Sequence, residues 1–155
     1  MDHGFDTARL AGLLEGLGRS FGLPGLKADD KGGCLLMFDD ALVTLQQDPA
    51  GQHLTMHTEV GRLAADASKE RLEALLAANL FWARTGGATL ALLPANRALL
   101  LARRLELERL SLADFEASLG EFLKAADAWR EQLALPEPRE GASWEAAAAM
   151  AGVRA

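Results

Sequence analysis

The sequence predicts an α+β fold in which an antiparallel sheet packs with helices. Two kinds of periodicity in the sequence predict it. Apolar residues recur at helical spacing in residues 5–21 and 111–133, and they alternate with polar residues in residues 53–60. The chain has 155 residues, 50% hydrophobic and 25% charged, which is the size and composition of one globular domain. We therefore expect one domain with one core.

The first helix is expected from about Phe5 to Phe21. Its apolar residues follow the spacing i, i+3, i+4, i+7 and i+11, which places them on one helical face: Leu10, Leu13, Leu14, Leu17 and Phe21. Asp6 or Thr7 can cap its start, and Pro24 forbids its continuation. This segment should be amphipathic, with one face in the core.

Three short strands should follow as an antiparallel meander. They are expected at Cys34 to Phe38, Ala41 to Gln46 and His53 to Val60. Asp39-Asp40 suits the first turn, and the sequence Asp-Pro-Ala-Gly at 48–51 matches a type I turn. The first strand is apolar on both faces, so one face should lie in the core and the other should face a partner. The sequence leaves open which is which.

A second helix should begin after Ser68, an N-cap residue, and end before Gly86-Gly87. From Leu72 to Ala83 it is apolar almost all round, and a helix without a polar face is covered on both sides. A single small layered domain does not supply that cover, so we expect a partner surface here. Thr89 to Leu93 then reads as a fourth strand.

Residues 97–107 allow two interpretations. Their Ala, Leu, Arg and Glu content favours a helix, whereas the alternating positions of their leucines fit a strand. The last helix is clearer: it should start at Ser111 and run to Leu133, with apolar residues at 4-3 spacing and a proline at 136. We therefore assign residues 1–135 to the domain and residues 136–155 to a flexible C-terminal tail.

Composition and charge exclude several classes of protein. The longest nearly apolar run, Ala74 to Ala83, is shorter than the ~17 residues that span a bilayer. Asp2 and Asp6 stand where a secretory signal has basic residues, so we expect a cytoplasmic protein without membrane insertion. The net charge is −6, and residues 1–66 carry 10 acidic against 5 basic side chains. That field repels phosphates, so no nucleic-acid partner is expected.

No catalytic or metal-binding pattern stands out. Cys34 opens an apolar strand and should be a buried, inert thiol. His53 and His57 share a strand face but lie ~13 Å apart at four residues' spacing, too far to share a metal. Asp39-Asp40 are better turn formers than a general acid and base. We expect no enzyme, no cofactor and no metal site.

Several apolar stretches together resemble a known family. They are Gly22-Leu23-Pro24 at the end of the first helix, Phe38-Asp39-Asp40 followed by Val43-Thr44-Leu45, Leu76-Ala77-Ala78-Asn79-Leu80, Gly87-Ala88-Thr89-Leu90-Ala91-Leu92, and Phe122 to Trp129. In this order the chain resembles the Tir-chaperone family, the dimeric class I chaperones of bacterial type III secretion, over about residues 5 to 135. The resemblance implies the element order α-β-β-β-α-β-β-α, with a strand at Arg97 to Leu107.

The resemblance also implies a function. Such chaperones catalyse no reaction; as a homodimer, each holds an extended segment of a secreted effector and keeps it soluble and secretion-competent. Effector-binding residues are then expected on the first helix and the first strands, namely Leu10, Leu14, Leu17, Leu35, Leu36, Met37, Phe38, Val43 and Leu45. Dimer-interface residues are expected on the second helix and the fourth and fifth strands, namely Leu76, Leu80, Phe81, Leu90, Leu92, Leu99 and Leu101.

Other interpretations stay open at this stage. Some relatives bind a regulatory protein and so couple secretion to transcription. A fold-related α+β binding module would serve another partner, and an enzyme would assemble its site from residues that no motif marks. Co-purification of an effector fragment separates these interpretations, because an enzyme would not retain a disordered peptide.

Overall fold

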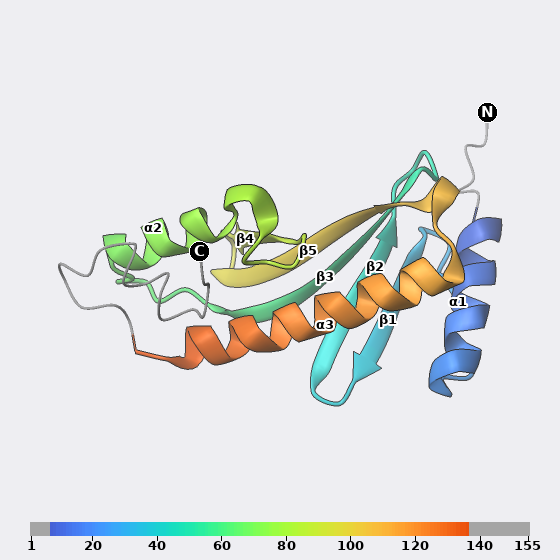
Figure 1. Ribbon diagram of the computed structural model, residues 1–155, viewed down its shortest axis with the longest axis horizontal. Helices are drawn as coiled ribbons and strands as arrows, with labels where there is room; N and C mark the ends of the chain where they lie inside the picture. The colour runs from blue at the N-terminus through green and yellow to red at the C-terminus, as the bar shows by residue number, and fades with distance from the viewer. Residues whose placement is uncertain (1–6, 137–155) are drawn as a thin grey trace. The chain divides into compact units, whose positions relative to one another are not determined.

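A computed structural model describes residues 7–136 of the chain (Figure 1). Its elements are α1 (Ala8–Phe21), β1 (Gly33–Phe38), β2 (Ala41–Gln47), β3 (His53–Arg62), α2 (Lys69–Ala78), β4 (Thr89–Leu93), β5 (Ala98–Glu106) and α3 (Leu112–Ala134). The five strands form an open antiparallel sheet in the order β1-β2-β3-β5-β4. The predicted α+β class and element order are therefore confirmed. The tail expected at 136–155 lies outside the described residues, apart from Pro136.

The chain divides into two compact units. Among the described residues, the first comprises residues 7–58 and 103–121, and the second comprises residues 59–102 and 122–136. β3, β5 and α3 therefore contribute residues to both units.

The first unit is organised around α1 and the hairpin of β1 and β2. The leucine stripe of α1 is buried as predicted, and buried side chains of β1, β2 and α3 join it in the core: Leu36, Val43, Leu45, Phe115 and Leu119. Thr7 occupies the N-cap position of α1, but its side chain makes no capping hydrogen bond. The helix ends at Gly22, whose φ of 65° is readily reached only by glycine.

The turns and register of the meander follow the sequence. Asp39 has a φ of 46° in the tight turn between β1 and β2, where Phe38 faces Ala41. The Gly51 N–H donates to the Asp48 carbonyl at 2.9 Å, the bond expected of the predicted β-turn. These turns set the pairing, so that alternate residues of β1 and β2 face the core.

The second unit corrects one expectation. The helix predicted through Ala83 stops at Ala78, and residues Leu80–Trp82 form a 3-10 turn in which Phe81 and Trp82 both have positive φ. The Asn79 side chain makes two hydrogen bonds with the backbone of Leu90. Its oxygen accepts from the Leu90 N–H at 2.8 Å, and its NH2 group donates to the Leu90 carbonyl at 3.0 Å. These bonds tie the end of α2 to β4. Nor is the helix covered on both sides within this chain, because Leu72 and Leu76 are exposed.

Residues 98–106 form a strand, as the resemblance implied and against helix propensity. β5 pairs with β4 so that Leu99 faces Leu92 and Leu101 faces Leu90. Leu99 and Leu101 are both buried. The predicted last helix is confirmed as α3, where the Ser111 hydroxyl accepts the Asp114 N–H at 3.1 Å and so caps its first turn.

Candidate functional site

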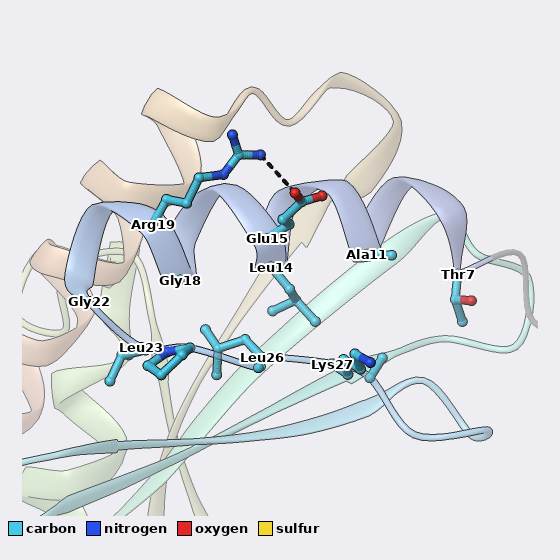
Figure 2. A pocket seen from close by; sticks show the side chains of 13 residues that line it. Thr7, Ala11, Leu14, Glu15, Gly18, Arg19, Gly22, Leu23, Leu26 and Lys27 are labelled. Carbon is cyan, nitrogen blue, oxygen red and sulfur yellow. Dashed lines mark hydrogen bonds and ion pairs between the residues drawn. The ribbon is translucent and has the colours of Figure 1, made fainter.

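The first unit carries an open groove of about 840 Å³ between α1 and the segment that follows it (Figure 2). One wall is the α1 face that includes Ala11, Leu14 and Gly18, and the other wall is the segment from Gly22 to Ala28. Leu14 points from the helix toward that segment (Figure 2), and its side chain is buried at the floor.

Local sequence explains why the second wall lies so close to the helix. The Leu23 N–H donates to the Gly18 carbonyl at 2.8 Å, and a Cβ at Gly18 would lie 2.6 Å from the Leu23 carbonyl oxygen. Only glycine at position 18 permits that approach without a backbone shift. Pro24 and Gly25, with a φ of 78° at the glycine, then turn the chain back along the helix.

The far wall offers unused backbone groups. Leu26, Lys27 and Ala28 belong to no helix or strand, and within residues 7–136 they make no backbone–backbone hydrogen bond. Leu26 and Ala28 are half-buried, whereas Lys27 is exposed. An extended peptide laid along this wall can pair with free N–H and C=O groups and place alternate side chains against the helix.

On the helix side, charge is confined to the edge of the groove, and Lys27 adds one exposed positive charge on the far wall. The Arg19 guanidinium lies 3.0 Å from the Glu15 carboxylate, and both side chains are exposed on α1, away from the far wall (Figure 2). An exposed i, i+4 pair of this kind contributes little to stability. The apolar floor and the charged edges favour a peptide that is apolar at alternate positions.

A second exposed apolar surface lies on the sheet face of β1 and β2 that points away from the core. Leu35 is 64% exposed and Met37 60%, and Leu42, paired with Met37 across the strands, is also exposed. Leu36, between them in sequence, is 1% exposed. The register that the sequence left open is thus decided: Leu36 faces the core and Leu35 faces outward. We call Leu35, Met37 and Leu42 the bare sheet face.

The residues expected to bind effector separate into two groups. Six are buried in this chain's own core: Leu10, Leu14, Leu17, Leu36, Val43 and Leu45. Leu35 and Met37 are exposed, and Phe38 is half-buried with its ring edge-on to Phe21 at a centroid distance of 6.0 Å. The far wall of the groove was not among the segments expected to bind effector. The sequence feature that could have indicated this wall is the pair Leu23 and Leu26 on either side of Pro24-Gly25.

The second unit carries an apolar cavity of about 250 Å³. It is lined by residues of α2, β4 and β5 and by the residues that directly follow β3 and α2: Leu63, Leu72, Leu75, Leu76, Asn79, Leu90, Ala91, Leu92 and Leu99. Of the residues expected at a dimer interface, Leu76, Leu80, Phe81 and Leu92 are exposed, whereas Leu90, Leu99 and Leu101 are buried within the chain. The expectation omitted two exposed neighbours, Leu72 and Trp82.

Among the described residues, burial and hydrogen bonding shift the pKa values of Cys34, Asp48 and His57. Burial, and to a lesser extent the nearby Asp29 carboxylate, raises the pKa of the Cys34 thiol and keeps it protonated. His53 Nδ1 lies 2.9 Å from Asp48 Oδ2, and this hydrogen bond lowers the pKa of Asp48. Burial lowers the pKa of His57. Among residues 7–136, no group of three or more His, Cys, Asp or Glu side chains is placed to hold a metal ion.

None of the helices in the described part of the chain has the length and apolar character needed to cross a bilayer.

Comparison with known proteins gives a consistent result. The family model for the Tir chaperone protein (CesT) family matches residues 12–130. The fold is similar to a crystal structure of the ExsC–ExsE complex, at 25% identity and a TM-score of 0.72 over 83% of this chain and 96% of that one. It is also similar to the HopA1–SchA chaperone–effector complex, at 25% identity and a TM-score of 0.67 over 81% and 98%.

A third similar structure is the ExoT–SpcS complex from Pseudomonas aeruginosa, at 24% identity and a TM-score of 0.57 over 77% and 95% of the two chains. No curated protein sequence gives a significant match.

Proposed function

The chain belongs to the Tir chaperone protein (CesT) family, and from this premise we propose that it is a type III secretion chaperone that binds an extended segment of a secreted effector. The observation that carries the proposal is the groove beside α1. It combines an apolar floor with a backbone at Leu26–Ala28 that makes no backbone–backbone hydrogen bond within residues 7–136, and free backbone groups beside an apolar surface can recruit an unfolded chain by strand addition. The HopA1–SchA structure is itself a chaperone–effector complex.

The bare sheet face supplies a second contact for the client. Leu35, Met37 and Leu42 form an outward apolar cluster next to the edge of the sheet, since β1 is an edge strand. Exposed apolar clusters of this kind mark interaction sites in soluble proteins. The client in this proposal stays extended, and keeping it unfolded preserves its competence for secretion.

The experiment that tests the groove removes one backbone donor. Lys27→Pro deletes the Lys27 N–H, and Lys27→Ala is the matched control because it deletes only an exposed side chain. Loss of one hydrogen bond worth ~0.5–1.5 kcal/mol should weaken client binding roughly 2- to 13-fold for the proline variant. The alanine variant should bind as the unmodified chain does. Equal binding by both variants, with unchanged thermal melts, would rule out pairing through the Lys27 N–H.

The proposal includes a homodimer formed through the second unit. Exposed apolar side chains cluster there on and after α2 and on β4, namely Leu72, Leu76, Leu80, Phe81, Trp82 and Leu92. A stable dimer buries ~800 Å² per partner around an apolar centre, and this cluster provides such a centre. Light scattering at micromolar concentration should report twice the 16.5 kDa chain mass. A single-chain mass would refute the dimer without affecting the groove.

In this proposal the protein works in the cytoplasm and has no enzymatic activity of its own. A client that co-purifies and is identified by mass spectrometry tests the chaperone role. A secreted effector supports the chaperone, whereas a regulator of secretion genes would point to the alternative regulatory role.

A further inference from the structure

The turn after α2 places two bulky residues in an unfavourable backbone conformation. Phe81 and Trp82 have φ of 56° and 55°, in the left-handed region that residues with a Cβ rarely adopt. Neighbouring bonds hold the turn: the Trp82 N–H donates to the Asn79 carbonyl at 3.2 Å, and the Trp82 indole N–H donates to the Thr89 hydroxyl at 3.3 Å. The conformation is thus built into the structure of the unit.

This conformation presents Phe81 to solvent. Its side chain is 82% exposed, the largest value among the exposed large hydrophobic residues described. Packing within its own chain therefore does not explain why a phenylalanine occupies this strained, exposed position. Strained backbone that the surroundings maintain is concentrated at functional sites.

The apolar cavity of the second unit lies at the same end of α2. Asn79 and Leu76 line it, and Phe81 follows two residues after Asn79. Its floor includes buried Leu75 and Leu99, and its rim includes exposed Ala91. Its volume is about 250 Å³, whereas an apolar cavity of roughly 150 Å³ already accommodates a benzene ring. A phenyl ring therefore fits, and none of the lining residues is charged.

We propose that Phe81 is the anchor of self-association and that its ring inserts into this cavity on a second copy of the chain. A two-fold interface uses the same patch on both copies, so it needs a projecting group and its complementary hollow side by side on one surface. Phe81 is exposed and follows the cavity-lining Asn79 by two residues, so the proposal places the ring and the hollow on one surface at this end of α2. The strained turn then serves to hold the ring in the projecting position before association, which reduces the ordering cost of binding.

This inference rests on the proposed homodimer and specifies which residue governs it. Another occupant of the cavity, such as an apolar side chain of a client, is an outcome that the experiment below distinguishes. The experiment measures the dimer dissociation constant by sedimentation and the melting temperature of each variant of the full chain.

Three variants test the anchor. Phe81→Ala removes the ring and should weaken the dimer at least tenfold, whereas Phe21→Ala, which removes an exposed phenylalanine of the first unit, should leave it unchanged. Phe81→Gly should weaken the dimer equally while its monomer melts no lower than that of Phe81→Ala, because glycine accepts the positive φ. A residue needed only for folding would instead change the melting temperature and leave the dissociation constant unaltered.

A mixing experiment tests the ring and the cavity together. Ala91→Trp should fill the cavity from its rim and, like Phe81→Ala, abolish tight self-association. Mixed, the two variants should form a heterodimer. The Phe81 ring of the tryptophan variant enters the open cavity of the alanine variant, and the filled cavity faces the copy that has no ring.

The outcomes separate this inference from the proposed function. Rescue on mixing supports the anchor. Failure of the mixture to associate, or an unchanged dissociation constant for Phe81→Ala, overturns the anchor. The proposed homodimer still stands in that case if the unmodified chain is dimeric. If Phe81→Ala stays dimeric but loses client, the cavity holds a client side chain instead.

Discussion

The strand β1 permits a sharp comparison between two adjacent leucines. Leu36 is 1% exposed in the core and Leu35 is 64% exposed on the bare sheet face. Replacing Leu36 with aspartate forfeits ~1.5–3 kcal/mol of apolar burial and adds the desolvation of an unpaired carboxylate, which costs several kcal/mol more. The total is comparable with the ~5–15 kcal/mol that stabilises a typical domain. We therefore expect Leu36→Asp to be unfolded.

Leu35→Asp should behave differently. A surface substitution changes stability by about 0.5 kcal/mol, and the poor strand propensity of aspartate adds up to about 1 kcal/mol. At 2–4 °C per kcal/mol for a chain of this size, its melting temperature should fall by about 6 °C or less. The variant should nevertheless lose client, because a carboxylate would replace an apolar contact.

Circular-dichroism melts and a pull-down with the co-purified client check both statements. Leu35→Ala is the matched control, since it shortens the contact without adding charge. If Leu35→Asp also unfolds, the bare sheet face is covered and the reasoning about β1 is wrong. If it folds and still retains client at full affinity, that face has no part in binding.

Four further predictions follow from the same structure. Leu80→Asp should give a folded monomer by light scattering, because Leu80 is exposed in the single chain. His57→Gln should remove part of the acid sensitivity of the thermal melt. Burial lowers the folded pKa of His57 below its unfolded value of ~6.5, so the unfolded chain binds more protons between those two values and stability falls as pH drops through that window. His53→Ala should raise the pKa of Asp48 toward its ordinary value, as measured by an NMR carboxylate titration. The hydrogen bond from His53 stabilises the native chain above the unfolded pKa of Asp48, ~3.9, and this stability is lost as pH falls below that value, so the variant should lack it at neutral pH. Deleting residues 136–155 should leave the shortened chain dimeric in light scattering, and a monomeric product would show that the tail contributes to assembly.

Local periodicity determined most of the secondary structure from the sequence alone. The stripe Leu10–Leu17 sets one helical face, the alternation of residues 53–60 sets a strand, and the turn at Asp48 joins two strands. These features depend on neighbours within a few residues, so the sequence contains the information needed to predict them. The recurring apolar pattern also sufficed to indicate the chaperone family.

Three features were decided only by tertiary structure. The face of β1 that enters the core depends on pairing with β2, because both faces are apolar and a shift of one residue exchanges them. The end of α2 at Ala78 depends on hydrogen bonds from Asn79 to a strand eleven residues later, which helix propensity does not include. Residues 98–106 are a strand because burial of Leu99 and Leu101 against β4 outweighs their helix propensity. In each case a distant partner, absent from the local sequence, determines the energy.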